Sequence, residues 1–297
     1  MGHNNRAPKE GNAPKAQSRR YRRRFGKKET PRTNGRRPCV ILDLFSLSGK
    51  TAIVTGSGRG IGKAIALAFG EAGADVVCTA RTIGQIEATA DRIREMGRKA
   101  MAIPCDVMNS EQVERLVETA IREWGHLDIL VNNAGGGSFG GVIRMSWSTF
   151  EADLHQNLTS TFICSRAVAP HMLAQKSGCI INISTRESQV PAMGLSAYAA
   201  AKAGVNSLTL TLAWELGPHV RVNAILPGAV ITETNAPIFE PIKDQLASLS
   251  PLNRMGTPED IALAALYLAS PAACWVTGRL FAIDGGAEWS NQVMGAR

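Results

Sequence analysis

Seven short apolar segments, spread along the chain and separated by stretches of helical periodicity, limit the possible folds more than any other feature. They are residues 51–55, 75–80, 100–104, 127–132, 179–184, 221–225 and 280–283. Helix-like stretches between them include residues 110–124 and 258–269; Thr257 is the expected N-cap of the latter, followed by Pro258 and Asp260. Such alternation predicts a doubly wound Rossmann-type three-layer α/β fold with a central, mostly parallel seven-stranded sheet.

The net charge of the 297-residue chain, +8, comes from its N-terminal part. Residues 1–45 hold 13 Lys or Arg and 3 Asp or Glu, whereas the other 252 residues hold 20 and 22. We therefore predict a basic, disordered extension over residues 1–45 and a single domain over residues 46–297, with no nucleic-acid partner for the domain. An RNA-contacting or membrane-contacting arm remains the alternative for the basic run 19–28, which has interleaved aromatic residues.

Several functional classes find no support in the composition. No run approaches the roughly 18 to 20 apolar residues that cross a bilayer, so no membrane span is expected. The six cysteines include no C-x-x-C pair and indicate free thiols in a reducing compartment, which predicts a cytoplasmic protein. The five histidines lack the spacing of metal ligands, so we predict no metal site.

A glycine-rich stretch, T-G-S-G-R-G-I-G, follows the first apolar segment directly. A glycine turn between a strand and a helix lets the backbone approach a pyrophosphate, while N–H groups and the helix dipole stabilise its charge. The pattern T-G-x-x-x-G-I-G differs from the G-x-G-x-x-G fingerprint, but its position after the first strand still predicts nucleotide binding. The predicted contacts are Gly56, Ser57, Gly58, Arg59, Gly60, Ile61 and Gly62.

Tyr198 and Lys202 lie one helical turn apart, on the same face of an expected helix. A phenol with a pKa of about 10 exchanges protons poorly at neutral pH, and a fixed cation beside it lowers that pKa. Such a pair suits carbonyl reduction or alcohol oxidation. By spacing alone, however, such a pair is usually an ordinary helix-surface contact.

Four motifs together resemble the shorter, single-domain branch of the short-chain dehydrogenase/reductase family. They are the loop 55–62, Asn132-Asn133-Ala134-Gly135 after the fourth strand, the Tyr198 and Lys202 pair, and Pro227-Gly228 with Thr232, in matching order over residues 44–287. The resemblance implies an NAD(P)-dependent oxidoreductase that interconverts a secondary alcohol and a ketone. Two alternatives remain open: a non-catalytic nucleotide-binding regulatory protein of the same fold, and an RNA-associated protein that acts through its basic arm.

The resemblance also implies roles for the catalytic residues. Tyr198 would exchange a proton with the substrate oxygen, Lys202 would contact the nicotinamide ribose and lower the pKa of Tyr198, and Asn157 would hold a water in the proton relay. For Asn157, a polar position on a helix surface is the alternative. Thr185 stands where the family usually has the substrate-orienting serine, and its hydroxyl can donate the same hydrogen bond. Ser184 is the alternative donor.

Cofactor choice depends on the end of the second strand, where the family's NAD-binding carboxylate is replaced by Ala80, followed by Arg81. Arg81, together with Arg59, could bind a 2′-phosphate, so NADP(H) is favoured over NAD(H). The other implied cofactor contacts are Asp106, Val107, Asn133, Ala134, Gly135, Tyr198, Lys202, Pro227, Gly228, Val230 and Thr232.

The substrate and the assembly are expected only in outline. The resemblance implies a small carbonyl or alcohol substrate, such as a hydroxysteroid or a 3-oxoacyl thioester, shaped by residues 136–144 and 186–195 and by a lid in the long irregular stretch 229–256. It also implies a homotetramer with contacts through residues 280–288, 150–174 and 197–216. Because relatives commonly begin near Leu42, we expect residues 1–39 to be an extension from a start upstream of Val40.

Overall fold

Each predicted apolar segment forms a strand, and the seven strands make one parallel sheet in the order β3-β2-β1-β4-β5-β6-β7. The computed structural model describes residues 1–2 and 40–287. The strands are β1 (Thr51–Thr55), β2 (Asp75–Ala80), β3 (Ala100–Pro104), β4 (Ile129–Asn132), β5 (Gly178–Ile183), β6 (Val220–Pro227) and β7 (Leu280–Ile283). The predicted doubly wound fold is confirmed.

The strand order reverses beside β1. The chain builds β1, β2 and β3 outward in one direction and then returns to β4 on the other side of β1, so that Val54 lies between Cys78 and Val131. In such sheets a ligand crevice opens at the carboxyl ends of the strands where the order reverses. A ligand crevice is therefore expected beside the segments that follow β1 and β4.

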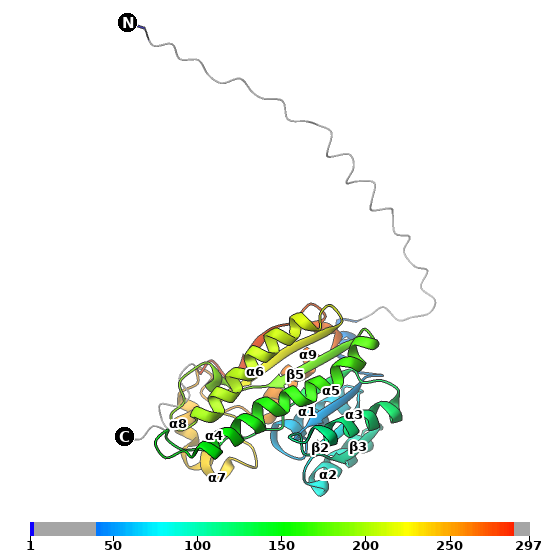
Figure 1. The fold of residues 1–297 in the computed structure, drawn as a ribbon, viewed down its shortest axis with the longest axis horizontal. Helices are drawn as coiled ribbons and strands as arrows, with labels where there is room; N and C mark the ends of the chain where they lie inside the picture. The colour runs from blue at the N-terminus through cyan, green and yellow to red at the C-terminus, as the bar shows by residue number, and fades with distance from the viewer. Residues whose placement is uncertain (3–39, 288–297) are drawn as a thin grey trace. The chain divides into compact units, whose positions relative to one another are not determined.

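Helices cover both faces of the sheet (Figure 1). The cluster of buried side chains on one face comes from α1 (Gly60–Glu71), α2 (Ile83–Glu95) and α9 (Pro258–Ala269), and the cluster on the other from α3 (Ser110–Trp124), α5 (Ser160–Ala174) and α6 (Ser196–Glu215). The bounds of α3 and α9 are those predicted from the sequence.

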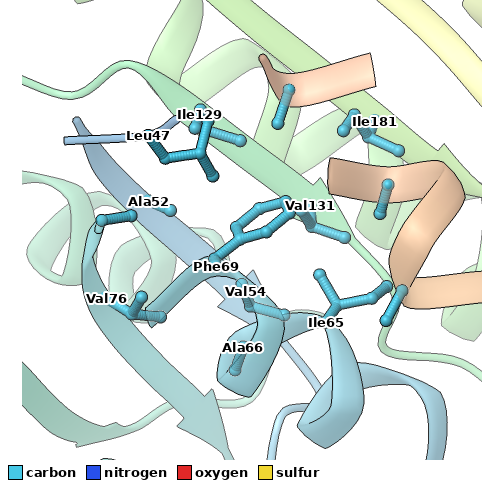
Figure 2. Close-up of a cluster of buried hydrophobic side chains, with 14 of the residues drawn as sticks. Leu47, Ala52, Val54, Ile65, Ala66, Phe69, Val76, Ile129, Val131 and Ile181 are labelled. Atoms are coloured by element: carbon cyan, nitrogen blue, oxygen red, sulfur yellow. The ribbon is translucent and has the colours of Figure 1, made fainter. Parts of the chain in front are cut away.

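Alternation along β1 joins the strands to both layers. Ala52 and Val54 pack toward α1, whereas Ile53 packs toward the opposite layer. Figure 2 shows the aromatic ring of Phe69, from α1, beside Val54 and Val131. Phe69 is fully buried, and burying a side chain of this size contributes about 1.5–3 kcal/mol. This packing fixes α1 on the sheet and so fixes the position of its N-terminus.

Shorter helical segments gather at one end of the domain (Figure 1). The helix α4 (Trp147–Leu154) passes into α5 through a π-helical turn, η2 (His155–Thr159). The stretch 229–256, predicted as irregular, instead contains α7 (Ala236–Phe239), a 3-10 turn and α8 (Lys243–Ser248). These helices have six or fewer residues, too few to show periodicity in the sequence.

The predicted basic extension falls largely on residues 3–39, which lie outside the described residues, as do residues 288–297. The described residues from Val40 onward belong to one compact unit. Its first element is a 3-10 helix, η1 (Ile41–Phe45), and the ring centroid of Phe45 lies 6.4 Å from that of Tyr267. Within the described part of the chain, no helix has both the length and the apolarity to cross a bilayer.

Candidate active site

A cleft of about 650 Å³ opens along the carboxyl edge of the sheet, in the size range of small-molecule sites. It collects residues that are far apart in the sequence. Predicted site residues that line it are Gly56, Gly58, Arg59, Gly60, Ile61, Arg81, Asp106, Val107, Asn133, Ala134, Gly135, Thr185, Tyr198, Lys202, Pro227, Gly228, Val230 and Thr232. Three others, Ser57, Gly62 and Asn157, do not line the cleft and lie behind its wall.

The glycine loop is tied to the end of β4 by hydrogen bonds. Asn133 donates from Nδ2 to the Thr55 carbonyl over 2.9 Å, and its backbone N–H donates to Thr55 Oγ1 over 2.9 Å. Gly56 has φ 66°, and a Cβ there would lie 2.8 Å from Asn133 Nδ2. Only glycine combines this backbone conformation with this close approach. The loop therefore presents bare backbone to the cleft.

Ser57 and Gly62 shape this loop from inside. Ser57 is fully buried, and its Oγ accepts a hydrogen bond of 2.8 Å from the backbone N–H of Thr79 in β2. A Cβ on Gly62 would collide with the Gly56 carbonyl. The motif places both residues in the loop, but only the fold shows that neither lines the cleft.

The N-terminus of α1 points at the cleft without a cap of its own. Its N-cap residue, Arg59, makes no side-chain cap bond, and the N–H of Gly60 donates to Glu233 Oε2 over 2.9 Å. Glu233 belongs to the stretch after β6, 173 residues away. A carboxylate thus binds where a helix N-terminus favours an anion. Sequence reasoning missed Glu233, because nothing local connects it with the glycine loop.

The end of the cleft at β2 carries cations. Arg81 follows β2 directly, Arg59 precedes α1, and Ala80 stands where the strand ends. Asp106, after β3, accepts a bond of 3.1 Å from the N–H of Met108. No carboxylate at the end of β2 is present to repel a phosphate.

Tyr198 and Lys202 occupy successive turns near the start of α6. The Lys202 ammonium lies 5.7 Å from the centre of the Tyr198 ring and donates to the Ile183 carbonyl over 2.8 Å. Only 4% of Lys202 is exposed, and this burial lowers the pKa of Lys202 to about 8. Lys202 is therefore positioned by the end of β5 and gives up its proton more easily than a surface lysine.

The pKa of Tyr198 differs from the prediction. Burial raises the pKa of the Tyr198 phenol, the Glu187 carboxylate raises it further, and a hydrogen bond with Thr185 opposes both. The sequence predicted a lowered pKa because Lys202 was expected to act on the phenol at close range. That prediction is wrong in direction, because the largest effect on the phenolate is the loss of its hydration.

The hydroxyls of Thr185 and Ser184 point to different partners. Thr185 Oγ1 donates to the Glu187 carboxylate and is hydrogen-bonded with Tyr198, whereas Ser184 Oγ donates to the Lys202 carbonyl over 3.2 Å. This geometry favours Thr185 over Ser184 as the hydroxyl beside the phenol. In the sequence, Glu187 is a charged residue two positions after Thr185, and its contact with Thr185 emerges only from the fold.

Asn157 is fully buried in the π-helical turn, so the alternative of a polar residue on a helix surface does not apply. Its Nδ2 donates to the carbonyls of Gly136 (2.7 Å) and Asp153 (2.9 Å), and its Oδ1 accepts from the N–H of Gly136 (3.2 Å). A Cβ on Gly135 would lie 2.6 Å from Asn157 Oδ1 and 3.4 Å from Lys202 Nζ. Asn157 Oδ1 and the Lys202 ammonium therefore both lie close to Gly135, which lines the cleft.

Asp153 is a further residue that the sequence did not single out. It is 3% exposed, and its carboxylate accepts hydrogen bonds from the backbone N–H (2.9 Å) and the hydroxyl (3.0 Å) of Ser138. The bonds hold the loop after β4 against α4. The spacing of Asp153 and Asn157, one turn apart on the same helix, is the one local signal that could have indicated the pair.

Thiol and metal chemistry receive no support in the described part of the chain. Cys105 lines the cleft, but burial raises the pKa of its thiol to about 11. Within residues 40–287, no group of three or more His, Cys, Asp or Glu side chains could hold a metal ion. Among the described residues that line the cleft, the phenol of Tyr198, the hydroxyl of Thr185 and the ammonium of Lys202 are the candidate reactive groups.

Comparison with known proteins identifies the family. The family model described as Enoyl-(Acyl carrier protein) reductase matches residues 56–288, which include the glycine loop, Tyr198 and Lys202. Together with the parallel sheet and the cleft, this match and the relatives below show that the chain belongs to the short-chain dehydrogenase/reductase family.

Three relatives illustrate the range of this similarity. A 3-oxoacyl-[acyl-carrier-protein] reductase of Synechocystis sp. is 39% identical over 82% of this chain and 98% of its own length. The crystal structure of a short-chain type dehydrogenase/reductase from Mycobacterium marinum is 38% identical, with a TM-score of 0.81 over 84% of this chain and 100% of its own. A 7α-hydroxysteroid dehydrogenase complexed with NADH and 7-oxo glycochenodeoxycholic acid is 37% identical, with a TM-score of 0.81 over 84% and 98%.

Proposed function

We propose that the chain is an NAD(P)-dependent oxidoreductase that interconverts a secondary alcohol and a ketone, with Tyr198 as the general acid and base. The observation that carries the proposal is the convergence of Tyr198, Thr185 and Lys202 in the same cleft as the glycine loop. This reaction needs a proton donor, a hydroxyl that can orient an oxygen, and a backbone loop that can bind a pyrophosphate. The activities of two relatives, a 3-oxoacyl-[acyl-carrier-protein] reductase and a 7α-hydroxysteroid dehydrogenase, support the same reaction class.

The cleft fits a dinucleotide. Cβ atoms on Gly56 and Gly58 would lie 2.8 Å and 2.7 Å from neighbouring side chains, so only glycines leave this backbone accessible. The Glu233 carboxylate on Gly60 N–H acts as a stand-in anion at the N-terminus of α1. A bound nicotinamide cofactor supplies or accepts the hydride.

The side chains of the protein carry the proton. In reduction, Tyr198 donates its phenolic proton to the substrate oxygen, and Thr185 orients that oxygen by donating a hydrogen bond. To do so, Thr185 turns its proton from Glu187 toward the substrate. Lys202 places an ammonium near the phenol, where it favours the phenolate that remains after transfer. Asn157 holds the loop that borders this space and offers Oδ1 to a relay water.

Tyr198→Phe tests the assignment, because the ring remains and the proton donor is lost. We expect kcat with ketones to fall by on the order of 100- to 10,000-fold, with little change in cofactor affinity. Steady-state rates and a fluorescence titration with NADPH measure the two quantities. Tyr267→Phe is the matched control, since Tyr267 lies in α9 and contacts Phe45 outside the cleft. Near-normal turnover by Tyr198→Phe would contradict the proposal.

For the cofactor, we propose a preference for NADP(H). Arg81 and Arg59 line the end of the cleft at β2, where Ala80 leaves no carboxylate to exclude a phosphate. Arg81→Ala should raise the KM for NADPH about tenfold or more and leave that for NADH within about twofold. Arg115→Ala is the control, since it removes an equal charge from an exposed position on α3. Equal changes in the KM for NADPH and for NADH would mean that Arg81 does not bind a 2′-phosphate. That result would favour NAD(H), the cofactor with which one relative was crystallised.

A homotetramer remains part of the proposal. Phe162 of α5 and Leu210 and Trp214 of α6 are exposed large apolar side chains on two of the helices predicted to form subunit contacts. Their exposure on one chain supports a partner surface there. Light scattering of the purified full chain measures the assembly, and a monomeric mass at micromolar concentration would contradict the prediction. A cytoplasmic location stays a prediction.

A further inference from the structure

The turn after β5 sends two adjacent charges in different directions. Arg186 and Glu187 begin the 3-10 helix η3 (Arg186–Ser188). Arg186 Nε lies 2.7 Å from Asp284 Oδ2, and both side chains are largely buried, with exposed fractions of 13% and 11%. Its Nη1 also donates to Gln189 Oε1 over 2.7 Å. Arg186 is thus held at the end of β7 and does not line the cleft, whereas Glu187 does.

Glu187 is one hydrogen bond away from the hydroxyl that would orient the reacting oxygen. Thr185 donates its proton to the Glu187 carboxylate. As long as Glu187 holds the Thr185 proton, Thr185 cannot donate to a carbonyl oxygen.

Other charges near Glu187 have partners elsewhere. On α6, the Lys202 ammonium donates to the Ile183 carbonyl. On α4, the Asp153 carboxylate accepts hydrogen bonds from Ser138. In η3, next to Glu187, Arg186 pairs with Asp284. Two carboxylates, Glu187 and Asp153, raise the pKa of Tyr198, and of the two only Glu187 lines the cleft. A donor on the substrate would be attracted to this place, and an anionic group would be repelled.

We propose that Glu187 makes this cleft select ketones and alcohols with a hydrogen-bond donor, a hydroxyl or an ammonium group, on the carbon next to the reacting carbon. The donor binds the Glu187 carboxylate in place of Thr185, and the Thr185 proton turns to the reacting oxygen. With a substrate that lacks the donor, Thr185 stays bonded to Glu187. The reacting oxygen of that substrate then receives no hydrogen bond from Thr185. The inference rests on the proposed oxidoreductase function and names the substrate class of that site.

A matched set of ketones tests the proposal with the full chain. The substrates are 2-hydroxycyclohexanone, 2-methoxycyclohexanone, which has no donor, and cyclohexanone, each measured with NADPH and NADH. We expect kcat/KM to favour the hydroxy compound over the methoxy compound by about 10- to 100-fold, the effect of one charge-assisted hydrogen bond. Glu187→Ala should reduce this ratio to about twofold or less, and Glu187→Gln, which keeps a neutral acceptor, should give an intermediate ratio.

Glu118→Gln removes the same charge from an exposed position on α3 and should leave the ratio unchanged. A pH profile separates a direct role of Glu187 from a structural one. Since the carboxylate raises the pKa of Tyr198, Glu187→Gln should move the alkaline rise of alcohol oxidation to lower pH. A purely structural role would change rates without that shift.

The outcomes distinguish this inference from the proposed function. Saturation-transfer NMR with the cofactor present measures binding of the same ketones without turnover. Turnover with equal kcat/KM for the hydroxy and methoxy compounds, or a preference that persists in Glu187→Ala, would overturn the inference alone. Donor-dependent binding that Glu187→Ala abolishes, without any turnover, would overturn the proposed function alone. Absence of both turnover and binding would overturn both.

Discussion

Two helices that pack against each other, α1 and α9, begin in opposite ways. At α9, Asp260 accepts from the N–H of Thr257 over 2.8 Å, and Arg254 forms two bonds of 2.7 and 2.8 Å with the same carboxylate. Pro258, at the first helical position, has no N–H to satisfy. At α1, the N-cap makes no side-chain bond and the first turn contains no acidic residue.

The difference separates a helix start that serves stability from one that serves binding. The N-terminus of α9 is satisfied by residues within six positions in the sequence. The N-terminus of α1 leaves donors to groups outside its own segment, and the described residues supply Glu233 for one of them. An N-terminus without a local cap is less stable by itself but remains available for an anion. Substitutions in the two regions should therefore affect different measurements.

Gly62→Ala should have the largest effect. Its Cβ would meet the Gly56 carbonyl and the Asn133 amide, so the glycine loop has to move. We expect cofactor affinity to fall about 100-fold or more and the free energy of unfolding to fall by about 1–3 kcal/mol. Fluorescence titration with NADPH and urea denaturation measure the two effects.

The matched control is Gly84→Ala in α2, where an added Cβ has no neighbour within 4 Å. This variant should gain about 0.5–1 kcal/mol in the free energy of unfolding, because alanine favours a helix. Its cofactor affinity should not change. Equal affinities for Gly62→Ala and Gly84→Ala would contradict the function assigned to the start of α1.

Asp260→Ala should affect stability alone, by about 1 kcal/mol. The hydrogen bond with Arg254 lowers the pKa of Asp260 to about 2, against an ordinary value of 3.8. A lowered pKa stabilises the fold above the unfolded value, so the difference from wild type should be constant at neutral pH and disappear as the pH falls from about 4 to about 2. Urea denaturation across this pH range measures the difference in the free energy of unfolding. A loss of cofactor affinity at neutral pH would contradict the assignment of a purely stabilising role to the start of α9.

Glu233→Ala should give the smallest effect, with the opposite sign for binding. Removing the carboxylate leaves the Gly60 N–H available, so cofactor affinity should increase by about three- to tenfold. Isothermal titration calorimetry with NADPH measures the change. Glu240→Ala, an exposed carboxylate on the same stretch paired with Lys243, is the control. Unchanged affinity in Glu233→Ala would show that Glu233 does not compete for this site.

Local sequence predicted the parts whose partners are local. The bounds of α3 and α9 followed from caps and periodicity, and the glycine turn after the first strand indicated a nucleotide-binding loop at that position. The contact between Glu233 and Gly60 could not be predicted, because only the fold brings these residues together. The pKa of Tyr198 was predicted with the wrong direction since spacing reports a neighbouring charge but not burial. The proposed substrate preference likewise rests on Glu187, whose contact with Thr185 depends on the geometry of η3.

The hydrogen bond from Gly60 to Glu233 has a thermodynamic consequence for the stretch 229–256. Any anion that takes this N–H has to break the contact, and the same free energy then enters both the affinity of the anion and the position of the stretch. Linkage makes the relation reciprocal: a tighter hold on the stretch weakens anion binding by an equal amount. One equilibrium therefore determines both the position of the residues around Glu233 and the occupancy of the α1 N-terminus by an anion.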